Sequence, residues 1–205
     1  MKHIIGSDEV GYGAWAGPLV VCAVAVPTDW RGPDGLNDSK EFKSAAEKAK
    51  RLLLYAALQH LPMSIVGIES AVIDKFGVGE ALIVAHEYAL KQMLERFPDA
   101  EVIVDGSRPI PGIPQARCIP KADATYPVVM AASIIAKVNR DLIMQEYHRQ
   151  YPHYGFDTNV GYGQKRGKHA DGLKTHGVCP IHRRSYQPIK NALFAARQLG
   201  LFEDS

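Results

Sequence analysis

Residues 3–27 read HIIGSDEVGYGAWAGPLVVCAVAVP and predict two strands joined by a glycine-rich turn. We expect a short strand over residues 3–8 and a longer, valine-rich one over residues 19–27, because short apolar runs bounded by Gly or Pro are typical of buried strands. The run over residues 19–26 is far shorter than the roughly 20 apolar residues that a membrane helix needs. Asp8 and Glu9 follow the N-terminus too closely for a signal peptide. We therefore expect a cytoplasmic protein without membrane contact.

The rest of the chain alternates between helical and strand patterns. The expected segments are a helix over 42–60, a strand over 64–68, a helix over 80–97, strands over 101–105 and 116–119, a long helix over 127–147 and a last helix over 189–199. Strands separated by helices indicate an α/β fold with a central sheet. The stretch 151–177 is rich in Gly, Tyr and basic residues, and we expect it to consist mainly of loops.

Charge is unevenly distributed along the chain. The 205 residues carry a net charge of only +2, but residues 137–190 contain ten Lys and Arg against four acids, which gives 10 − 4 = +6. Such a stretch fits a phosphate-facing surface, and it also fits an ordinary solvated face. The three widely spaced cysteines favour reduced thiols over a disulfide framework.

Four acidic residues follow predicted strands or precede the long helix. Asp8 and Glu9 end the first strand, Asp105 ends the strand over 101–105, and Asp123 comes shortly before the long helix. Sites in open α/β sheets collect beyond strand ends. Two Mg²⁺ or Mn²⁺ ions held by such carboxylates would activate water and stabilise charge during phosphodiester hydrolysis.

The same acids also have a structural interpretation. An isolated Asp at a strand end is often a cap or a turn former. Neighbouring strand residues point to opposite faces, so Asp8 and Glu9 share a site only if the strand bends or ends there. The spacing alone leaves both interpretations open.

Five ordered motifs resemble those of the ribonuclease HII family. Residues 7–18, SDEVGYGAWAGP, resemble its opening motif, and the later matches are NDSK at 37–40, VDG at 104–106, KAD at 121–123 leading into AASIIAKV at 131–138, and YGF at 154–156 with GYG at 161–163 and PIHRRS at 180–185. The resemblance covers nearly the whole chain. It implies a ribonuclease H-like α/β core, with a central mixed sheet flanked by helices and a helical C-terminal part.

The resemblance also implies an activity. The family hydrolyses the RNA strand of RNA/DNA hybrids and incises duplex DNA at embedded ribonucleotides, using two metal ions and leaving 5′-phosphate and 3′-hydroxyl ends. Its catalytic and metal-binding acids correspond to Asp8, Glu9, Asp105 and Asp123. We expect one catalytic domain over residues 1–205, with an α/β core over about 1–125 and a helical, loop-rich substrate-binding part over about 126–205.

The family's substrate contacts fall on further residues. Gly11 and Gly13 correspond to glycines that contact the ribonucleotide, Tyr162 to the tyrosine that reads the RNA-to-DNA junction, and Lys40 to a lysine near the phosphates. The family usually has Arg where this chain has Tyr12, which leaves open the preference between a single ribonucleotide and a long hybrid.

Four polar residues complete the expected substrate-binding set. Ser133 and Lys137 share a face of the long helix, and three roles stay open for them: facing the duplex, supporting Asp123, or neither. Arg183 and Arg184 either grip phosphate or form structural ion pairs.

Alternative functions separate on simple grounds. The opening motif also resembles ribonuclease HIII, a sister family with an additional N-terminal domain for which this chain has no room. A second alternative is a module that binds hybrids without cutting them, but such a module would gain nothing from acidic side chains beside phosphates. A third is a junction resolvase with the same core, which would cleave four-way DNA junctions instead of hybrids. A zinc site at His176, Cys179 and His182 is rejected because a fourth ligand is not obvious. We expect a monomer. Residues 201–205 show no evident clamp-binding motif, and contact with a sliding clamp is left open.

Overall fold

The computed structural model describes residues 2–36, 44–164 and 166–198. Their backbone forms two compact units. Unit 1 comprises Met1–Val10, Val20–Gly67 and Leu82–Asn139, and unit 2 comprises Gly11–Leu19, Ile68–Ala81 and Arg140–Ser205.

Unit 1 contains a five-stranded mixed sheet in the order β3-β2-β1-β4-β5. Its strands are β1 (His3–Val10), β2 (Leu19–Pro27), β3 (Met63–Ile68), β4 (Glu101–Asp105) and β5 (Arg117–Ile119). β1 pairs antiparallel with β2 and parallel with β4, and β4 pairs parallel with β5. The expected α/β fold with a central mixed sheet is confirmed.

The ladders on the two sides of β1 end at different residues. Pairing with β2 continues to Val10, opposite Val20, whereas pairing with β4 stops at Ser7, opposite Val104. Asp8 and Asp105 therefore each lie one residue beyond the last parallel pair. This edge of the sheet is the one at which the sequence predicted a site.

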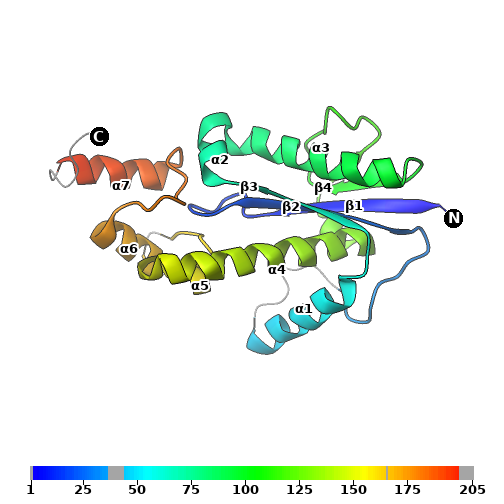
Figure 1. Ribbon diagram of the computed structural model, residues 1–205, viewed down its shortest axis with the longest axis horizontal. Helices are drawn as coiled ribbons and strands as arrows, with labels where there is room; N and C mark the ends of the chain where they lie inside the picture. The colour runs from blue at the N-terminus through cyan, green and yellow to red at the C-terminus, as the bar shows by residue number, and fades with distance from the viewer. Residues whose placement is uncertain (1, 37–43, 165, 199–205) are drawn as a thin grey trace. The chain divides into compact units, whose positions relative to one another are not determined.

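Helices cover both faces of this sheet. Figure 1 shows α3 (Val78–Arg96) on one face, and α1 (Ala45–Leu58) and α4 (Pro127–Gln150) on the other. One apolar cluster joins the valines of β2 to α1 and α4, including Val24, Leu58 and Ile135. Gly6 allows α4 to lie close against β1, because a Cβ there would come within 2.7 Å of the Val128 and Val129 backbone.

Unit 2 is built mainly from short helices. These are α2 (Ser70–Phe76), a 3₁₀ turn η3 (Pro152–Tyr154), α5 (Phe156–Asn159), α6 (Lys168–His176) and α7 (Gln187–Gln198). Apolar side chains of these helices, such as Phe156 and Ile189, form a separate core together with Met144 of α4.

The strand predictions over 19–27 and 101–105 match the observed bounds. β1 extends two residues further than expected, to Val10, because β2 continues to pair with it. α2, α5 and α6 were not predicted. The last of these is polar and lies between Gly167 and Gly177, so its sequence resembles a loop. Among the described residues, no helix is both long and apolar enough to span a membrane.

The observed units divide the chain differently from the expected boundary near residue 126. α4 begins in unit 1 and continues into unit 2 beyond Asn139, and the segments Gly11–Leu19 and Ile68–Ala81 also belong to unit 2. The segment that follows β1 thus packs with the C-terminal part, a long-range contact that a linear pattern does not reveal.

Candidate active site

Three of the four predicted acids converge in unit 1. Carboxylate oxygens of Asp8, Glu9 and Asp105 all lie within 4.8 Å of one another. Asp8 is buried and Glu9 and Asp105 are half-buried. The cluster therefore lies where the parallel strands end. Asp8 is its most buried member, and Glu9 and Asp105 are partly exposed to solvent.

Local geometry explains how two consecutive strand residues share one site. The Glu9 amide donates to Oδ1 of Asp8 at 2.8 Å, so the Asp8 side chain turns along the strand toward the following residue. Because β4 no longer pairs with β1 after Ser7, that edge of the backbone is open to such a contact.

Asp123 lies near this cluster in the fold but is not one of its three members. It is buried in the 3₁₀ turn η2 (Ala122–Ala124), which directly precedes α4. The neighbouring Ala122 amide donates to Oδ1 of Asp105 at 2.7 Å. The turn that carries Asp123 is thus attached to the cluster through its backbone.

Ser133 supports the deepest acid. Its buried hydroxyl hydrogen-bonds to the Asp8 carboxylate. To the roles that the sequence left open for Ser133, the structure adds one that was not considered, a hydrogen bond from a buried hydroxyl to Asp8. Lys137 follows one turn later on α4 and is half-buried.

His86 is a site residue that the sequence analysis missed. Ser7 Oγ donates to the Cys22 carbonyl at 3.0 Å and accepts from His86 Nδ1 at 2.9 Å. The buried Nε2 atom of His86 then lies 3.7 Å from Oε2 of Glu9. The signal was available, because His86 shares the apolar face of its helix with Leu82, Ala89 and Met93, where a polar side chain needs a reason to be buried.

The electrostatics of the cluster favour a cation. Burial raises the pKa of Asp8 well above its usual range, and the charges of Glu9 and Asp105 raise it further, while the Ser133 hydrogen bond lowers it. A divalent cation between these oxygens would relieve both the repulsion and the desolvation. Hard cations prefer this all-oxygen donor set, so the residues present fit Mg²⁺ or Mn²⁺.

Unit 2 contains the glycine-rich loop of residues 11–18, and two buried arginines hold its carbonyl groups. Arg140 donates to Pro18 at 2.8 Å and to Ala16 at 3.1 Å. Arg183 donates to Gly17 at 3.0 Å and to Tyr12 at 2.8 Å. The sequence left open whether Arg183 contacts phosphate or forms a structural ion pair; it is fully buried and its guanidinium donates to these backbone carbonyls, so its side chain supports the loop. Two of the ten cations in the basic stretch therefore do not face solvent.

Tyr162 lies against the beginning of this loop. The Gly11 amide donates to its hydroxyl at 3.2 Å, and the Arg140 guanidinium lies 5.5 Å from its ring centroid. Tyr162 remains 39% exposed, so one side of the ring is available to a ligand. Tyr12 and Gly13 are also exposed.

The remaining predictions have mixed outcomes. Lys40 and the motif around it lie outside the described residues. Arg184 is exposed, and its backbone amide donates to Asp74 at 2.8 Å. Within the ranges that the structure describes, Asp8, Glu9 and Asp105 form a group whose carboxylate oxygens could hold a metal.

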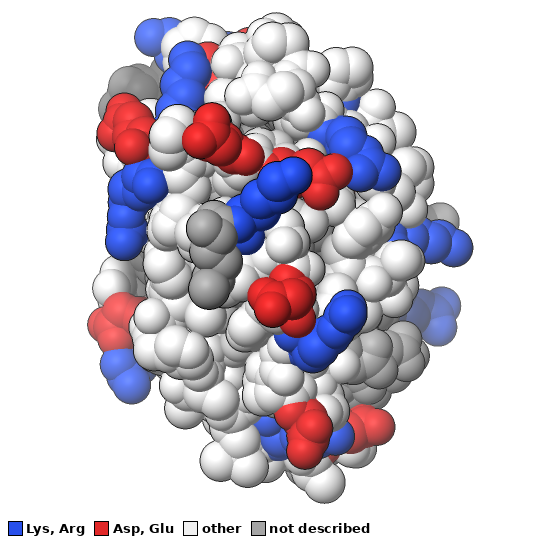
Figure 2. Space-filling view, turned by 90° about the vertical axis from the view of Figure 1, so that its right-hand side faces the viewer, with Lys and Arg blue, Asp and Glu red and all other residues white. Residues whose placement is uncertain are grey.

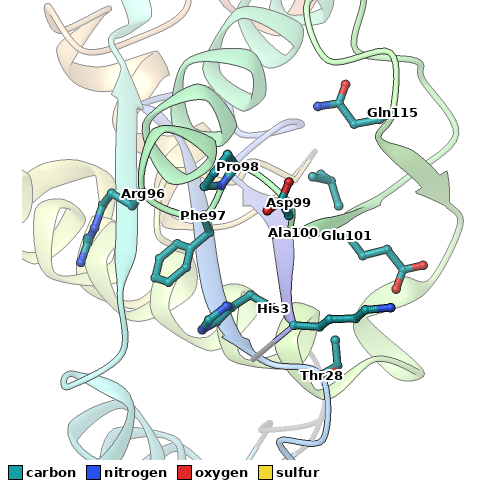
Figure 3. A pocket seen from close by; sticks show the side chains of 11 residues that line it. His3, Thr28, Arg96, Phe97, Pro98, Asp99, Ala100, Glu101 and Gln115 are labelled. Carbon is teal, nitrogen blue, oxygen red and sulfur yellow. The ribbon is translucent and has the colours of Figure 1, made fainter.

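A cavity of about 1070 Å³ in unit 1 lies at the opposite end of the strands. Its lining residues are Lys2, His3, Thr28, Arg96, Phe97, Pro98, Asp99, Ala100, Glu101, Val102 and Gln115. In Figure 3 the rings of His3 and Phe97 lie side by side, with centroids 4.6 Å apart. None of the predicted site residues lines it, and we do not assign the chemistry to it.

The face in Figure 2 intersperses blue and red side chains, so it has no field of one sign that would steer a polyanion.

Comparison with known proteins agrees with this geometry. The model of the family described as Ribonuclease HII matches residues 5–189. The chain belongs to the ribonuclease HII family. It is 42% identical over 193 residues to ribonuclease HII of Listeria monocytogenes serotype 4a, covering 93% of this chain and 70% of that protein. It is 41% identical over 194 residues to the Ligilactobacillus salivarius enzyme, covering 94% and 72%. Members of this family are ribonuclease H hydrolases that act on RNA/DNA hybrids.

Solved structures of ribonucleases H share the fold. Ribonuclease H2 from Pyrococcus horikoshii OT3 aligns with a TM-score of 0.67 at 23% identity, over 96% of this chain and 99% of that one. Ribonuclease HII in a PCNA complex from Archaeoglobus fulgidus gives 0.70 at 24% identity, over 94% and 96%. Bst-RNase HIII in complex with Mn²⁺ gives 0.68 at 20% identity, over 96% and 71%. At these identities the likeness shows the fold alone.

Proposed function

We propose that this ribonuclease H incises the RNA strand at ribonucleotides within duplex DNA as well as in long hybrids, by two-metal-ion hydrolysis that leaves 5′-phosphate and 3′-hydroxyl ends. The observation that carries the proposal is the convergence of Asp8, Glu9 and Asp105 within 4.8 Å at the end of the parallel strands. Acids so close together and partly buried are costly for a fold unless a cation compensates their charge.

Asp8, Glu9 and Asp105 would hold Mg²⁺ or Mn²⁺, with Asp123 as the fourth acid of the pair of sites. The ions, when bound, supply Lewis acidity at the attacking and leaving oxygens. The protein's own residues hold the carboxylates in place: Ser133 orients Asp8, and the Ala122 amide orients Asp105. The solved Mn²⁺ complex of Bst-RNase HIII supports the choice of metal.

Substrate recognition would use the glycine-rich loop and Tyr162. Backbone at Gly13 is accessible because nothing lies within 4 Å of the position of a Cβ. This allows close approach of a ribose, whose 2′-hydroxyl distinguishes RNA from DNA. The exposed face of Tyr162 would stack or wedge against the neighbouring sugar, and the exposed Lys and Arg side chains, Arg184 among them, would contact phosphates. Lys137 is proposed to face the duplex.

The test is cleavage-site mapping with Mg²⁺ or Mn²⁺ on three duplexes: DNA containing one ribonucleotide, a long RNA/DNA hybrid, and a four-way DNA junction. We expect incision of the first two with 5′-phosphate products and no cleavage of the junction. Cleavage of the junction alone would favour a resolvase, and binding of a hybrid without cleavage under either metal would favour a non-catalytic module. Incision of the hybrid alone would show that Tyr12, in place of Arg, removes the single-ribonucleotide activity.

We also propose that the protein acts as a cytoplasmic monomer. The PCNA complex of the Archaeoglobus fulgidus protein makes a clamp contact worth testing, by light scattering of the protein with and without a sliding clamp. A mass of one chain in the free protein is the expected result.

A further inference from the structure

Unit 2 contains two buried histidines that the proposed chemistry does not use. His169 and His182 are 3% and 1% exposed, and their Nε2 atoms lie 2.9 Å apart. Aromatic rings enclose the pair, with Tyr154 and Phe156 centroids 4.9 Å and 5.2 Å from the rings of His182 and His169, respectively. Two such polar rings in an apolar core need a structural or functional reason.

The hydrogen bonds determine which nitrogen carries each proton. His169 Nδ1 lies 3.1 Å from the carbonyl oxygen of Tyr162, which can only accept, so this nitrogen is protonated. The neutral ring then accepts at Nε2, and His182 must donate from its Nε2 atom. His182 Nδ1 lies 3.0 Å from the Cys179 amide and thiol and 3.3 Å from the Cys179 carbonyl. Because the amide can only donate and is nearer than the carbonyl, we assign Nδ1 as the acceptor, which gives a consistent arrangement of two neutral rings.

The chemistry of the site keeps both rings neutral. Burial, together with the smaller effect of the neighbouring His169 ring, lowers the pKa of His182 to about 3. Burial also lowers the pKa of His169. A proton added to either ring would place two donors against each other.

This chain of hydrogen bonds ends on the backbone of Tyr162. The Tyr162 amide donates to the Asn159 carbonyl at 2.9 Å, and His169 Nδ1 donates to the Tyr162 carbonyl. The following residue, Gly163, lies directly against the Trp15 ring, where a Cβ would come within 1.9 Å. The Tyr162 hydroxyl accepts from Gly11. The main chain and the ring tip of Tyr162 are therefore both fixed, while one side of the ring faces solvent.

We propose that His169 and His182 are positioning residues that fix Tyr162 for contact with the sugar at the RNA-to-DNA junction, and so contribute to the choice of cleavage site. The proposal rests on the proposed function, because it assigns these histidines to the residue that would read the junction. The tautomer of each ring is essential to it: His169 must donate from Nδ1 and accept at Nε2.

The first test is independent of activity. In ¹⁵N-histidine-labelled protein near neutral pH, we expect His169 to be the Nδ1–H tautomer and His182 the Nε2–H tautomer, assigned with His169→Asn and His182→Gln. Observation of the Nε2–H form at His169, or of a charged ring, would overturn the proposal.

The second test is a double-mutant cycle on a duplex containing one ribonucleotide. We expect His169→Leu to lower the cleavage rate about tenfold, because small displacements of a positioning group can cost up to about 100-fold. In a Tyr162→Ala background the same change should have an effect of no more than about twofold, because the residue through which it acts is gone. If His169→Leu lowers the cleavage rate by the same factor with Tyr162 and with Ala at that position, its effect does not act through Tyr162, and the proposal is refuted.

Conservative variants keep the test decisive if His169→Leu does not fold. His169→Asn places an amide donor near the Nδ1 position and should retain cleavage within about threefold, since the bond to Tyr162 survives. A loss equal to that of Tyr162→Ala would contradict this. His153→Asn, at an exposed histidine of the same unit, is the matched control. If the wild-type protein cleaves no substrate, the proposed function fails, whereas normal cleavage with an independent His169 effect refutes only the positioning role.

Discussion

The backbone amide of Ala122 donates a 2.7 Å hydrogen bond to Oδ1 of Asp105 and so attaches the turn before α4 to the end of β4. This contact holds Oδ1 of Asp105, whose carboxylate also lies in the cluster with Asp8 and Glu9. It also brings the backbone beside Asp123 to the cluster, although the Asp123 side chain is not one of the three converging acids.

Asp105→Asn is expected to separate folding from metal binding. The side-chain amide keeps an oxygen acceptor for the Ala122 amide, so the thermal midpoint without metal should change little. Mn²⁺ affinity should fall at least about 100-fold, because even residues behind metal ligands cost 10–100-fold when they are changed. Calorimetry with Mn²⁺ measures this, with Glu101→Gln, at the exposed start of the same strand, as the control.

Asp8→Asn is expected to stabilise the metal-free protein while abolishing cleavage. The folded state holds Asp8 in a buried, like-charged environment, so replacing it with a neutral isostere should add about 1–2 kcal/mol to the unfolding free energy near pH 8. Added Mn²⁺ should then raise the midpoint of the wild type more than that of the variant. Denaturation in EDTA and in Mn²⁺ measures both effects, and a variant less stable than the wild type in EDTA would show that Asp8 is not strained. Binding to a hybrid should remain largely intact.

The pH dependence of this effect has a definite sign. The folded-state pKa of Asp8 lies above its ordinary value of 3.8, so the stability linked to its proton is present below that value and is lost as pH rises through the folded-state pKa. In EDTA the gap between Asp8→Asn and the wild type should therefore widen as pH rises. A gap that narrows would contradict the raised pKa.

The buried histidine pair should have the opposite effect at low pH. The pKa of His182 is lowered from 6.5 to about 3 in the folded protein, so its contribution to stability is present above pH 6.5 and is lost as pH falls toward 3. The slope from this group can reach about 1.4 kcal/mol per pH unit in that window. Denaturant unfolding from pH 7 to pH 4 should show a shallower slope for His182→Gln than for the wild type. Equal slopes would mean that His182 is not buried and neutral.

Gly11 and Gly13 make a matched pair in one loop. A Cβ at Gly11 would lie 2.3 Å from Arg140 Nε, at a φ of +92°, so Gly11→Ala should destabilise the protein by about 2 kcal/mol or more. Gly13 has open space around it, so Gly13→Ala should change stability by less than about 0.5 kcal/mol and reduce cleavage by blocking the substrate. Thermal denaturation and kinetics of both variants test this, and a Gly13→Ala enzyme with wild-type cleavage would exclude close approach at that residue.

The sequence was informative where chemistry and chain position coincide. Asp8, Glu9 and Asp105 were predicted because strand ends of an α/β sheet converge. The parallel ladder of β1 and β4 places Asp8 and Asp105 one residue beyond its last pair, and Glu9 follows Asp8. Only the structure explains how Asp8 and Glu9, which are neighbours on a strand, reach the same site. The Asp8 carboxylate accepts from the Glu9 amide and so turns along the strand.

Other features depended on contacts between distant segments. Whether Arg183 faces phosphate or carbonyl groups cannot be read from a motif, because burial is decided by how residues 11–18 pack against the C-terminal part. His86 and the pair of His169 and His182 were missed for the same reason: a histidine's role follows from the partner at each nitrogen. The short helix α6 was missed because its polar sequence carries a weak helical signal.

Arg183 and Arg184 are neighbours with opposite expected effects. Arg183 donates to the carbonyls of Tyr12 and Gly17 and to the Tyr186 hydroxyl at 2.9 Å, so Arg183→Lys should lose about 2–4 kcal/mol of stability because an ammonium group cannot reach all three. Arg184 is exposed, so Arg184→Ala should leave stability nearly unchanged and weaken hybrid binding, with a salt slope about one unit smaller if it contacts a phosphate. Binding isotherms in EDTA at several salt concentrations, beside thermal denaturation, distinguish the two. A reduced salt slope for Arg183→Lys with an unchanged midpoint would mean that Arg183, despite its burial, is the residue that contacts phosphate.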